Sequence, residues 1–360
     1  MFIAKKFILV MLSVFAFVAC SPDVYDDEET IKIGVMLSLT GDAAQVSNDI
    51  KNAILEMNKK YADKNIKTQL IIEDTSGDTK KVLAVANKLI YIDKVDVIIT
   101  TISSNAILVS PLAHKEGILH FGTVDNANKE VNTTTFTHWT TPEQKAKKLV
   151  ELLNNDNAKN VAIVIQNIET QKTLSMAVEK EIQKHKLDSQ TYYFNSNNLD
   201  FRTDLLKIKN KNYDKIVLLM FSPMIDIVAR QIDELNIETP LTAIASFIYS
   251  QNKSRFEGIP FINSYTSDDA DILDVKNKVN ALSTHALPQF WDIFEIVSDV
   301  VNKFYSKHSR KPNGREMTDI ILNMREYDGK TGHLDIEADR TIQSQASVII
   351  IKNGIVTVID

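Results

Sequence analysis

The chain of 360 residues contains one cysteine, Cys20, and only 10 glycines. One cysteine cannot form an intramolecular disulfide, and zinc sites built on several thiolates are excluded as well. There is no Gly-x-Ser-x-Gly elbow, no P-loop and no dinucleotide-binding glycine fingerprint. The seven histidines form no His-x-x-x-His pair and no His/Glu cluster, so we expect no metal site. We therefore expect a protein that is not an enzyme and that carries no cofactor.

An excess of basic residues is also lacking. Lysine and arginine number 41 against 47 acidic residues, for a formal net charge of −6. Nucleic-acid binders normally show a basic face or stripe, so we expect no nucleic-acid partner. Beyond the first twenty residues there is no apolar run long enough to cross a bilayer. The length leaves room for two domains of ordinary size.

The first twenty residues carry a targeting signal. Lys5 and Lys6 precede a short apolar run over 7–18, followed by Ala19 and Cys20. A basic start, a short apolar stretch and a small residue at the cleavage point are typical of a secretory signal. Because Cys20 directly follows Ala19, the segment resembles a bacterial lipobox, in which the thiol is lipidated and becomes the first mature residue. The alternative is a plain signal peptide with an incidental cysteine.

This resemblance divides the leader into a lipoprotein signal peptide over 1–19 and a polar, acidic, lipidated tether over 20–30. It implies an extracytoplasmic protein, in the periplasm or on the cell surface, that is held to a bacterial membrane by its lipid. With Cys20 lipidated, the mature chain has no thiol available for chemistry.

After residue 30, strands and helices alternate. Apolar, β-branched runs predict strands, and apolar residues at helical spacing predict the helices between them. This order predicts a parallel sheet with helices on both faces. The predicted strands are 31–37, 68–72, 95–100 and 117–121, and the helices 43–61, 79–92 and 107–115.

The pattern restarts after Thr141-Pro142, a helix-start signal. The fold class is therefore α/β with two doubly wound lobes, and ligands of such sheets bind beyond the carboxyl ends of the strands. Asn353-Gly354 predicts a terminal hairpin. Here the strands are 161–165, 191–194, 215–220, 241–245, 346–351 and 355–358, and the helices 143–153, 174–186, 200–208, 225–235, 271–281, 289–305 and 315–323.

Several segments resemble, in order, the type I periplasmic binding proteins, specifically the branch that binds Leu, Ile and Val. They are residues 31–35 (IKIGV) with 39–41 (LTG), 73–78 (EDTSGD), 103–104 (SS) and 327–335 (YDGKTGHLD). The resemblance implies two Rossmann-like lobes joined by a three-strand hinge, which close on the ligand. Lobe one would comprise 31–141 plus 270–325, and lobe two 142–269 plus 326–360.

The resemblance also implies binding residues on lobe one. Ser103 would bind a ligand carboxylate, with Ser104 and free backbone N–H groups at the same helix N-terminus. The alternative is that one of these serines only caps the helix. Val124, Asp125 and Asn126 would contact the ligand from the loop after the fourth strand, although Asn126 could equally be a turn residue.

On lobe two the match is weaker. The family's aromatic residue falls near Thr170, and Phe221 aligns with a tyrosine pair. The acidic residue that meets the ligand ammonium falls at Ala245 or Ser246, where no carboxylate is present. A neutral hydroxyl is a poor partner for a desolvated ammonium.

The sequence leaves two questions about the site open: which carboxylate meets the ligand ammonium, and where Trp139 lies. Asp125 or Glu169 are the alternative carboxylates for the ligand ammonium. Trp139, just before the first crossing, either lines the cleft or packs near the hinge.

The function implied is a lipid-anchored solute-binding protein. It would capture a small polar solute, an amino acid or an amide, and deliver it to the permease of an ABC importer. The alternative is an interaction or sensory lipoprotein of the same fold that has lost amino-acid binding.

Overall fold

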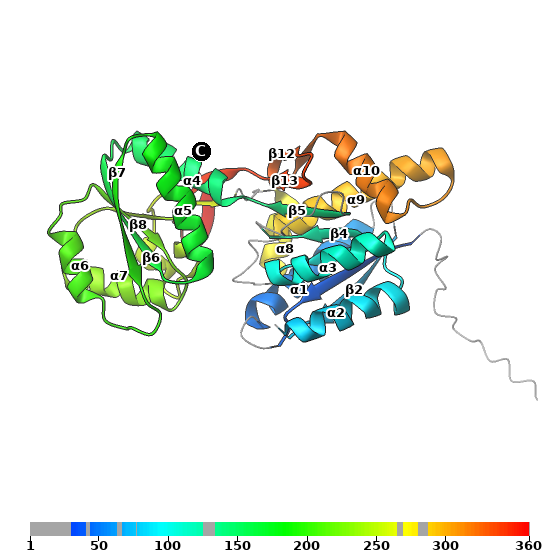
Figure 1. The fold of residues 1–360 in the computed structure, drawn as a ribbon, viewed down its shortest axis with the longest axis horizontal. Coiled ribbons are helices and arrows are strands. Elements are labelled where there is room, and N and C mark those ends of the chain that lie inside the picture. The colour runs from blue at the N-terminus through cyan, green and yellow to red at the C-terminus, as the bar shows by residue number, and fades with distance from the viewer. Residues whose placement is uncertain are drawn as a thin grey trace, which may run out of the picture.

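The computed structural model describes residues 30–40, 44–62, 67–76, 78–124, 134–264, 269–279 and 287–359. The predicted signal peptide, Cys20 and nearly all of the tether lie outside these ranges. The described chain forms two α/β lobes placed side by side along the long axis of the molecule (Figure 1). No helix in these ranges is both long and apolar enough to span a membrane.

Lobe one is built on an eight-stranded sheet that combines segments from both ends of the chain. Strand β1, which lies between β3 and β2, is buried almost throughout, as expected for a parallel strand covered on both faces. The strands are β1 (Ile31–Leu37), β2 (Thr68–Asp74), β3 (Val97–Thr100), β4 (Leu119–Gly122), β5 (Thr135–Trp139), β11 (Glu326–Gly329), β12 (Gly332–Ile336) and β13 (Thr341–Gln343). Their order is β11-β12-β13-β5-β4-β3-β1-β2.

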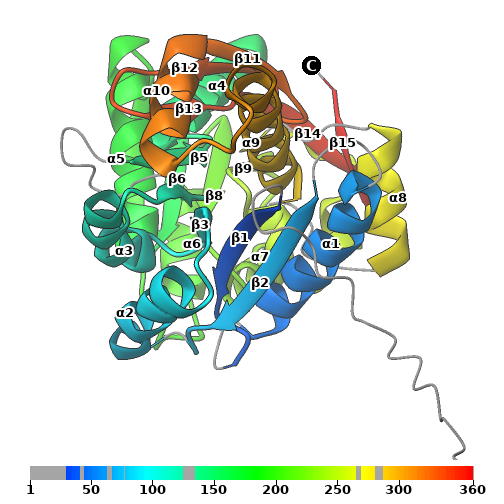
Figure 2. The same cartoon turned by 90° about the vertical axis from the view of Figure 1, so that its right-hand side faces the viewer.

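Helices cover both faces of this sheet (Figure 2). The larger core lies beneath α1, α8 and α9 and includes Ile54, Phe290 and Trp291, whereas α2 and α3 pack over a smaller core around Leu89 and Val109. The helices are α1 (Ala44–Ala62), α2 (Thr79–Asn87) with the π-helical turn η1 (Lys88–Ile92), α3 (Ser103–Glu116), α8 (Ala270–Val279), α9 (Leu287–His308) and α10 (Gly314–Met324).

Lobe two has a four-stranded parallel sheet and a small antiparallel sheet. The parallel strands are β6 (Asn160–Gln166), β7 (Asp188–Phe194), β8 (Lys215–Leu219) and β9 (Leu241–Ala243), and the antiparallel ones β10 (Phe261–Ser264), β14 (Ala346–Lys352) and β15 (Ile355–Val358). The sheet orders are β7-β6-β8-β9 and β10-β14-β15.

The parallel sheet of lobe two is also covered on both faces. Helices α4 (Pro142–Asn155) and α5 (Glu169–Lys184) pack on one face. Helices α6 (Arg202–Lys209) and α7 (Met224–Glu234), with the short 3-10 turns η2 (Ser246–Tyr249) and η3 (Lys253–Phe256), pack on the other. The predicted fold class, α/β with two doubly wound lobes, is confirmed.

The chain passes between the lobes after β5, after β10 and after β13. The first and third crossings lie against each other. The Thr140 hydroxyl lies 2.8 Å from the Ser344 hydroxyl, and Gln144 Nε2 donates to Gln343 Oε1 at 3.1 Å. Each crossing therefore restrains the direction of the other.

One predicted lobe boundary is wrong. The resemblance implies that residues 326–360 belong to lobe two, but β11, β12 and β13 extend the sheet of lobe one, with Thr341 paired to Thr137 of β5. The chain crosses back to lobe two at Ser344 and Gln345, between β13 and β14. These strands are short and polar, so neither length nor apolar alternation marked them as part of a sheet.

Strands β5 and β10 were also missed by the sequence analysis. The segments are TFTHW and FINS, which are short and rich in polar residues, and tertiary contacts bury them. The predicted terminal hairpin is confirmed, because β14 and β15 pair around Asn353 and Gly354, whose φ values are 52° and 75°.

A buried carboxylate connects three segments of lobe one. Asp292 of α9 and His138 of β5 are both fully buried, and His138 Nε2 lies 3.0 Å from Asp292 Oδ2. The same carboxylate accepts hydrogen bonds from the backbone N–H of Lys330, the backbone N–H of Thr331 and the Thr331 hydroxyl. The turn between β11 and β12 is thereby held against α9 and β5.

A glycine permits this close approach. A Cβ atom added at Gly329 would lie 2.4 Å from Asp292 Oδ1. The turn also reaches the residue before α8, since Lys330 Nζ lies 2.9 Å from Asp269 Oδ2. The turn that holds Asp292 thus also holds the point where the second crossing enters lobe one.

We expect Asp292→Ala to lower the free energy of unfolding by about 3–5 kcal/mol, because it leaves His138 and two backbone N–H groups buried without their acceptor. The matched control is Asp299→Ala on the same helix. Asp299 is exposed and accepts from the Tyr327 hydroxyl at 3.0 Å, so its loss should cost about 1 kcal/mol or less. Urea unfolding measures both variants, and equal costs would contradict the assigned role of Asp292.

Candidate functional site

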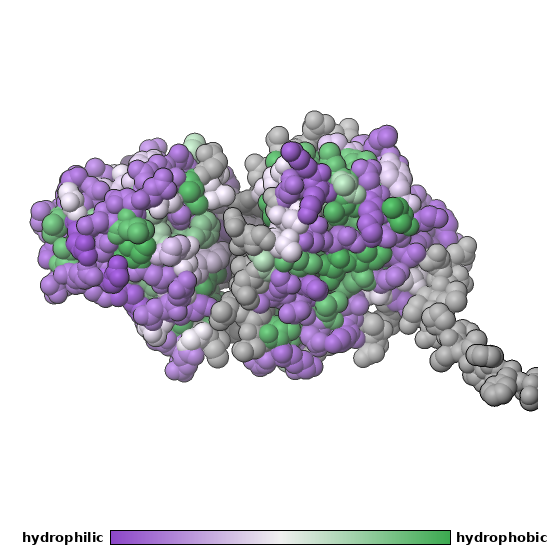
Figure 3. Space-filling model, turned by 90° about the horizontal axis from the view of Figure 1, so that it is seen from below, coloured by the Kyte–Doolittle hydropathy of each residue, from purple (hydrophilic) through white to green (hydrophobic). Residues whose placement is uncertain are grey.

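A cavity of about 400 Å³ lies between the two lobes. Its walls are formed where parallel strands end: Ser103 follows β3, Val124 follows β4, Phe221 follows β8 and Ala245 follows β9. The two lobes form separate masses in the space-filling view (Figure 3). The position is the one expected for ligands of open α/β sheets, here with two sheets contributing.

Ser103 and Val124 line the cavity on the lobe-one side, as the sequence analysis expected. Ser104 is exposed and is not part of the lining. Asp125 and Asn126 lie outside the described residues. The structure therefore brings two of the five lobe-one candidates to the cavity.

The start of α3 is open toward the cavity. The residue that precedes the helix is Ile102, whose side chain makes no capping hydrogen bond. Neither Ser103 nor Ser104 occupies the N-cap position. The alternative that one of these serines only caps the helix is therefore wrong. The first N–H groups of a helix have no partner within the helix, and here they lie beside the lining residues Thr101, Ile102 and Ser103.

A second helix begins at the cavity from lobe two. Helix α5 follows Ile168, which also provides no side-chain cap, and its residues Thr170, Gln171 and Leu174 line the cavity. The Gln171 side chain is buried, with 5% of its surface exposed, and its Oε1 has no hydrogen-bond partner. Two helix N-termini, each with a partial positive charge, therefore meet at one cavity.

Aromatic side chains form another part of the lobe-two wall. Phe221 and Tyr249 both line the cavity, with their rings edge to face and their centroids 5.0 Å apart. Burial raises the pKa of Tyr249 to about 12. Its phenol is therefore protonated and neutral near pH 7, and it can donate a hydrogen bond.

Ser246 has a different place from the one expected. It is buried with 1% of its surface exposed and is not part of the lining. Its hydroxyl donates to the Leu218 carbonyl at 2.8 Å and accepts from the Met220 backbone N–H at 2.9 Å. The hydroxyl thus joins η2 to the end of β8. The neighbouring Ala245, with φ 58°, lines the cavity instead.

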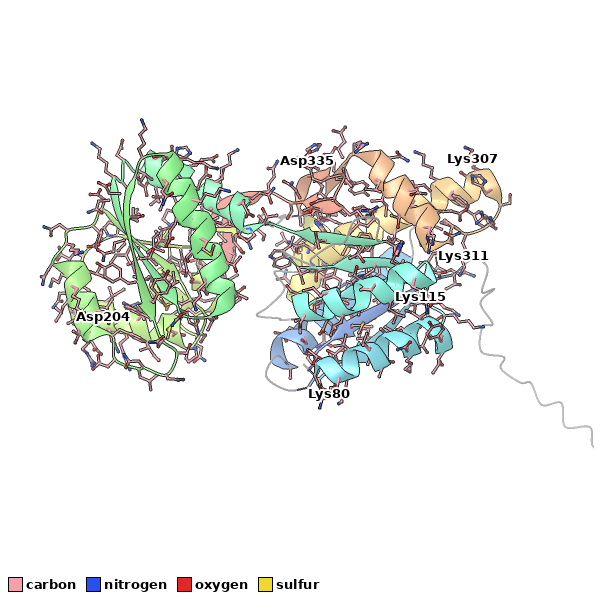
Figure 4. The ribbon with its side chains drawn as sticks, viewed as in Figure 1. Lys80, Lys115, Asp204, Lys307, Lys311 and Asp335 are labelled. Atoms are coloured by element: carbon pink, nitrogen blue, oxygen red, sulfur yellow. The ribbon has the colours of Figure 1, made fainter. Side chains whose placement is uncertain are left out.

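The residues of the first crossing complete the lining. Trp139 and Pro142 reach the cavity together with Lys145 of α4, whose Nζ lies 5.7 Å from the centroid of the Trp139 ring. Trp139 also packs against the lobe-one core, so both of its predicted roles hold. By contrast, Lys80, Lys307 and Asp204, labelled in Figure 4, lie at the outer surfaces of their lobes.

Sequence reasoning missed Lys145, Gln171 and Tyr249. Lys145 and Gln171 lie in the first turn of helices that begin at the cavity, and Tyr249 lies in a short turn after the last parallel strand. A search of the first turn of each predicted helix would have found Lys145, because that helix is predicted over 143–153, whereas Gln171 precedes the helix predicted over 174–186. The side of each helix that faces the cavity depends on packing.

Comparisons with known proteins agree with this architecture. The sequence model of a family described as periplasmic binding protein matches residues 30–282. No curated protein sequence matches the chain.

Among solved structures, a leucine binding protein, LivK, from Thermotoga maritima is 18% identical, with a TM-score of 0.70, covering 92% of this chain and 98% of that one. A solute binding protein of an ABC transporter from R. palustris, in complex with 4-hydroxybenzoate, is 18% identical, with a TM-score of 0.72 and coverages of 92% and 96%. LivJ from Streptococcus pneumoniae, in complex with isoleucine, is 17% identical, with a TM-score of 0.70 and coverages of 91% and 97%. At these identities the likeness shows the fold.

We expect Ser246→Ala to lower the free energy of unfolding by about 1–3 kcal/mol, because it leaves the buried Met220 N–H without its acceptor. Ser103→Ala is the matched control, since Ser103 lines the cavity and should change stability by about 0.5 kcal/mol or less. Denaturant unfolding of both variants measures the difference. A larger cost for Ser103→Ala would contradict the structural role assigned to Ser246.

Proposed function

Because the chain belongs to the periplasmic binding protein family, we propose that it is a solute-binding protein that captures a small organic solute between its lobes and delivers it to the permease of an ABC importer. The observation that carries the proposal is the cavity lined by residues of both lobes and of the first crossing. A solute that contacts both walls binds the closed arrangement more tightly than the open one, so it shifts the protein toward closure. No bond is made or broken in this role.

The solute proposed from the sequence is polar, an amino acid or an amide. Ser103, Val124, Thr170 and Phe221 are the predicted binding residues that line the cavity, and we propose that they contact the solute. Solved structures similar to this chain include proteins bound to isoleucine and to 4-hydroxybenzoate. The screen below therefore includes amino acids, amides and aromatic acids.

We also propose that Cys20 carries the lipid that holds the protein, on the extracytoplasmic side, to a bacterial membrane. This rests on the lipobox-like order of residues 5–20. A lipid anchor with a short tether would keep the folded lobes close to a permease in the same membrane.

A thermal-shift screen of the purified chain tests the solute-binding proposal. A solute at one hundred times its Kd should stabilise the folded state by about 2.7 kcal/mol, which raises the melting temperature measurably. Phe221→Ala should weaken binding of any hit about 10-fold or more, because it removes an aromatic wall of the cavity. Tyr193→Ala, at an exposed position of β7, should leave the affinity unchanged. A folded protein that no solute stabilises would contradict the proposal and favour the interaction lipoprotein.

Phase separation in a cloud-point detergent tests the anchor. Expressed in a bacterial host, the unmodified chain should enter the detergent phase, whereas Cys20→Ser should remain in the aqueous phase because it cannot be lipidated. Ser21→Ala, one position along, should behave as the unmodified chain does. Recovery of Cys20→Ser in the detergent phase would show that the anchor is not at this cysteine.

A further inference from the structure

The aromatic part of the lobe-two wall is made by two segments that are distant in sequence. Phe221 follows β8, and Tyr249 is the last residue of the 3-10 turn η2. Their rings meet edge to face with centroids 5.0 Å apart, and both side chains line the cavity. Such a pair adds only a little to the stabilisation that comes from the area it buries. Its geometry therefore depends on how the two segments are held.

The start of η2 and the chain before Phe221 are joined by bonds already described. Ser246, the first residue of η2, accepts from the backbone N–H of Met220, which precedes Phe221. Phe221 donates its own backbone N–H to Gln166 Oε1 at 3.0 Å. The chain after Phe221 and the end of η2 are joined by a different side chain.

That side chain is Asp226, in the first turn of α7. Its Oδ2 accepts at 3.1 Å from the hydroxyl of Ser222, the residue that follows Phe221. Its Oδ1 accepts at 2.5 Å from the hydroxyl of Ser250, the residue that follows Tyr249. One carboxylate therefore holds the two residues that come directly after the two aromatic side chains.

Asp226 lies behind the wall of the cavity. It is not among the residues that line the cavity, and its side chain is partly buried. Ser250 is buried, with 4% of its surface exposed. The backbone N–H of Gln251 also donates to Asp226 Oδ2, at 3.3 Å. Hydrogen bonds to a charged acceptor are among the stronger ones, so a partly buried carboxylate with three donors resists displacement.

We propose that Asp226 is a positioning residue of the solute site. It holds Phe221 and Tyr249 in their edge-to-face arrangement and so sets the shape of the lobe-two wall that a solute meets. The inference rests on the proposed solute-binding function. Side chains that are already held in place lose less conformational freedom when a solute binds, so the affinity is higher than for a wall that must first be ordered.

Fluorine NMR on the full chain in detergent tests the geometry without any solute. 4-Fluorophenylalanine placed at position 221 gives a resonance whose chemical shift depends on the neighbouring ring. Tyr249→Leu in the same labelled chain gives the reference shift without that ring. We expect Asp226→Ala to move the resonance at least halfway to this reference. Asp226→Asn should move it less, because an amide can accept from one serine hydroxyl and donate to the other.

Asp233→Ala is the matched control. Asp233 is an exposed residue of the same helix that pairs with Arg255 and does not line the cavity, so its loss should leave the resonance in place. Ser250→Ala removes one bond of the Asp226 carboxylate and should move the resonance in the same direction as Asp226→Ala. An unmoved resonance in folded Asp226→Ala, or in folded Ser250→Ala where the first variant does not fold, overturns the proposal.

Calorimetry tests the consequence for binding, with isoleucine and 4-hydroxybenzoate as the first probes and any solute found by the thermal-shift screen as the next. For a probe that binds, Asp226→Ala should weaken the affinity by about 3- to 10-fold, and Asp233→Ala by less than about 2-fold. In a chain that already carries Phe221→Ala, adding Asp226→Ala should weaken the affinity by less than about 2-fold, because the ring that Asp226 positions is gone.

The outcomes separate this inference from the proposed function. If the resonance moves while the affinity for a bound probe stays the same, Asp226 has no role in binding. Equal losses of affinity with and without the Phe221 ring overturn its action through that ring. If the resonance moves as expected but the folded protein binds neither the probes nor any screened solute, the proposed function fails, while the role of Asp226 in holding the aromatic pair is supported.

Discussion

The buried carboxylate of Asp292 is the interaction on which the arrangement of lobe one depends. It joins α9, the end of β5 and the turn between β11 and β12, and that turn holds Asp269 through Lys330. A buried carboxylate must keep its hydrogen-bond donors, so these segments cannot separate without a large cost in free energy. His138 precedes Trp139, which lines the cavity. The same network therefore places the end of β5 and the first wall residue of the crossing.

The cavity follows from two sheets that present their carboxyl ends to each other. In a doubly wound sheet each strand end is followed by a helix start, so both lobes bring helix N-termini to the same space. Here α3 and α5 arrive without side-chain caps, and α4, whose own N-terminus is capped by Thr141, contributes Lys145.

Much of the fold could be predicted from the sequence, because apolar periodicity records which faces are buried. The α/β alternation and the terminal hairpin are examples. Ser103, Val124, Thr170 and Phe221, which the family resemblance implied as binding residues, do line the cavity. Gln171 and Tyr249 could not be found from the sequence, since the true start of a helix and the side of a turn that faces a cavity depend on packing between segments distant in sequence. Ser246 shows the opposite case: its position in the chain suggested the cavity, yet its hydroxyl joins η2 to the end of β8.

The sequence by itself determined the α/β class, the two-lobed order and the absence of disulfides and thiolate metal sites, since these depend on local periodicity and on residue counts. Tertiary structure alone decided that β11, β12 and β13 belong to lobe one, because a short polar strand is defined by its partner rather than by its own pattern. It also decided which side chains line the cavity. The cavity wall is assembled from several segments of the chain, and no single segment shows which of its side chains face the cavity.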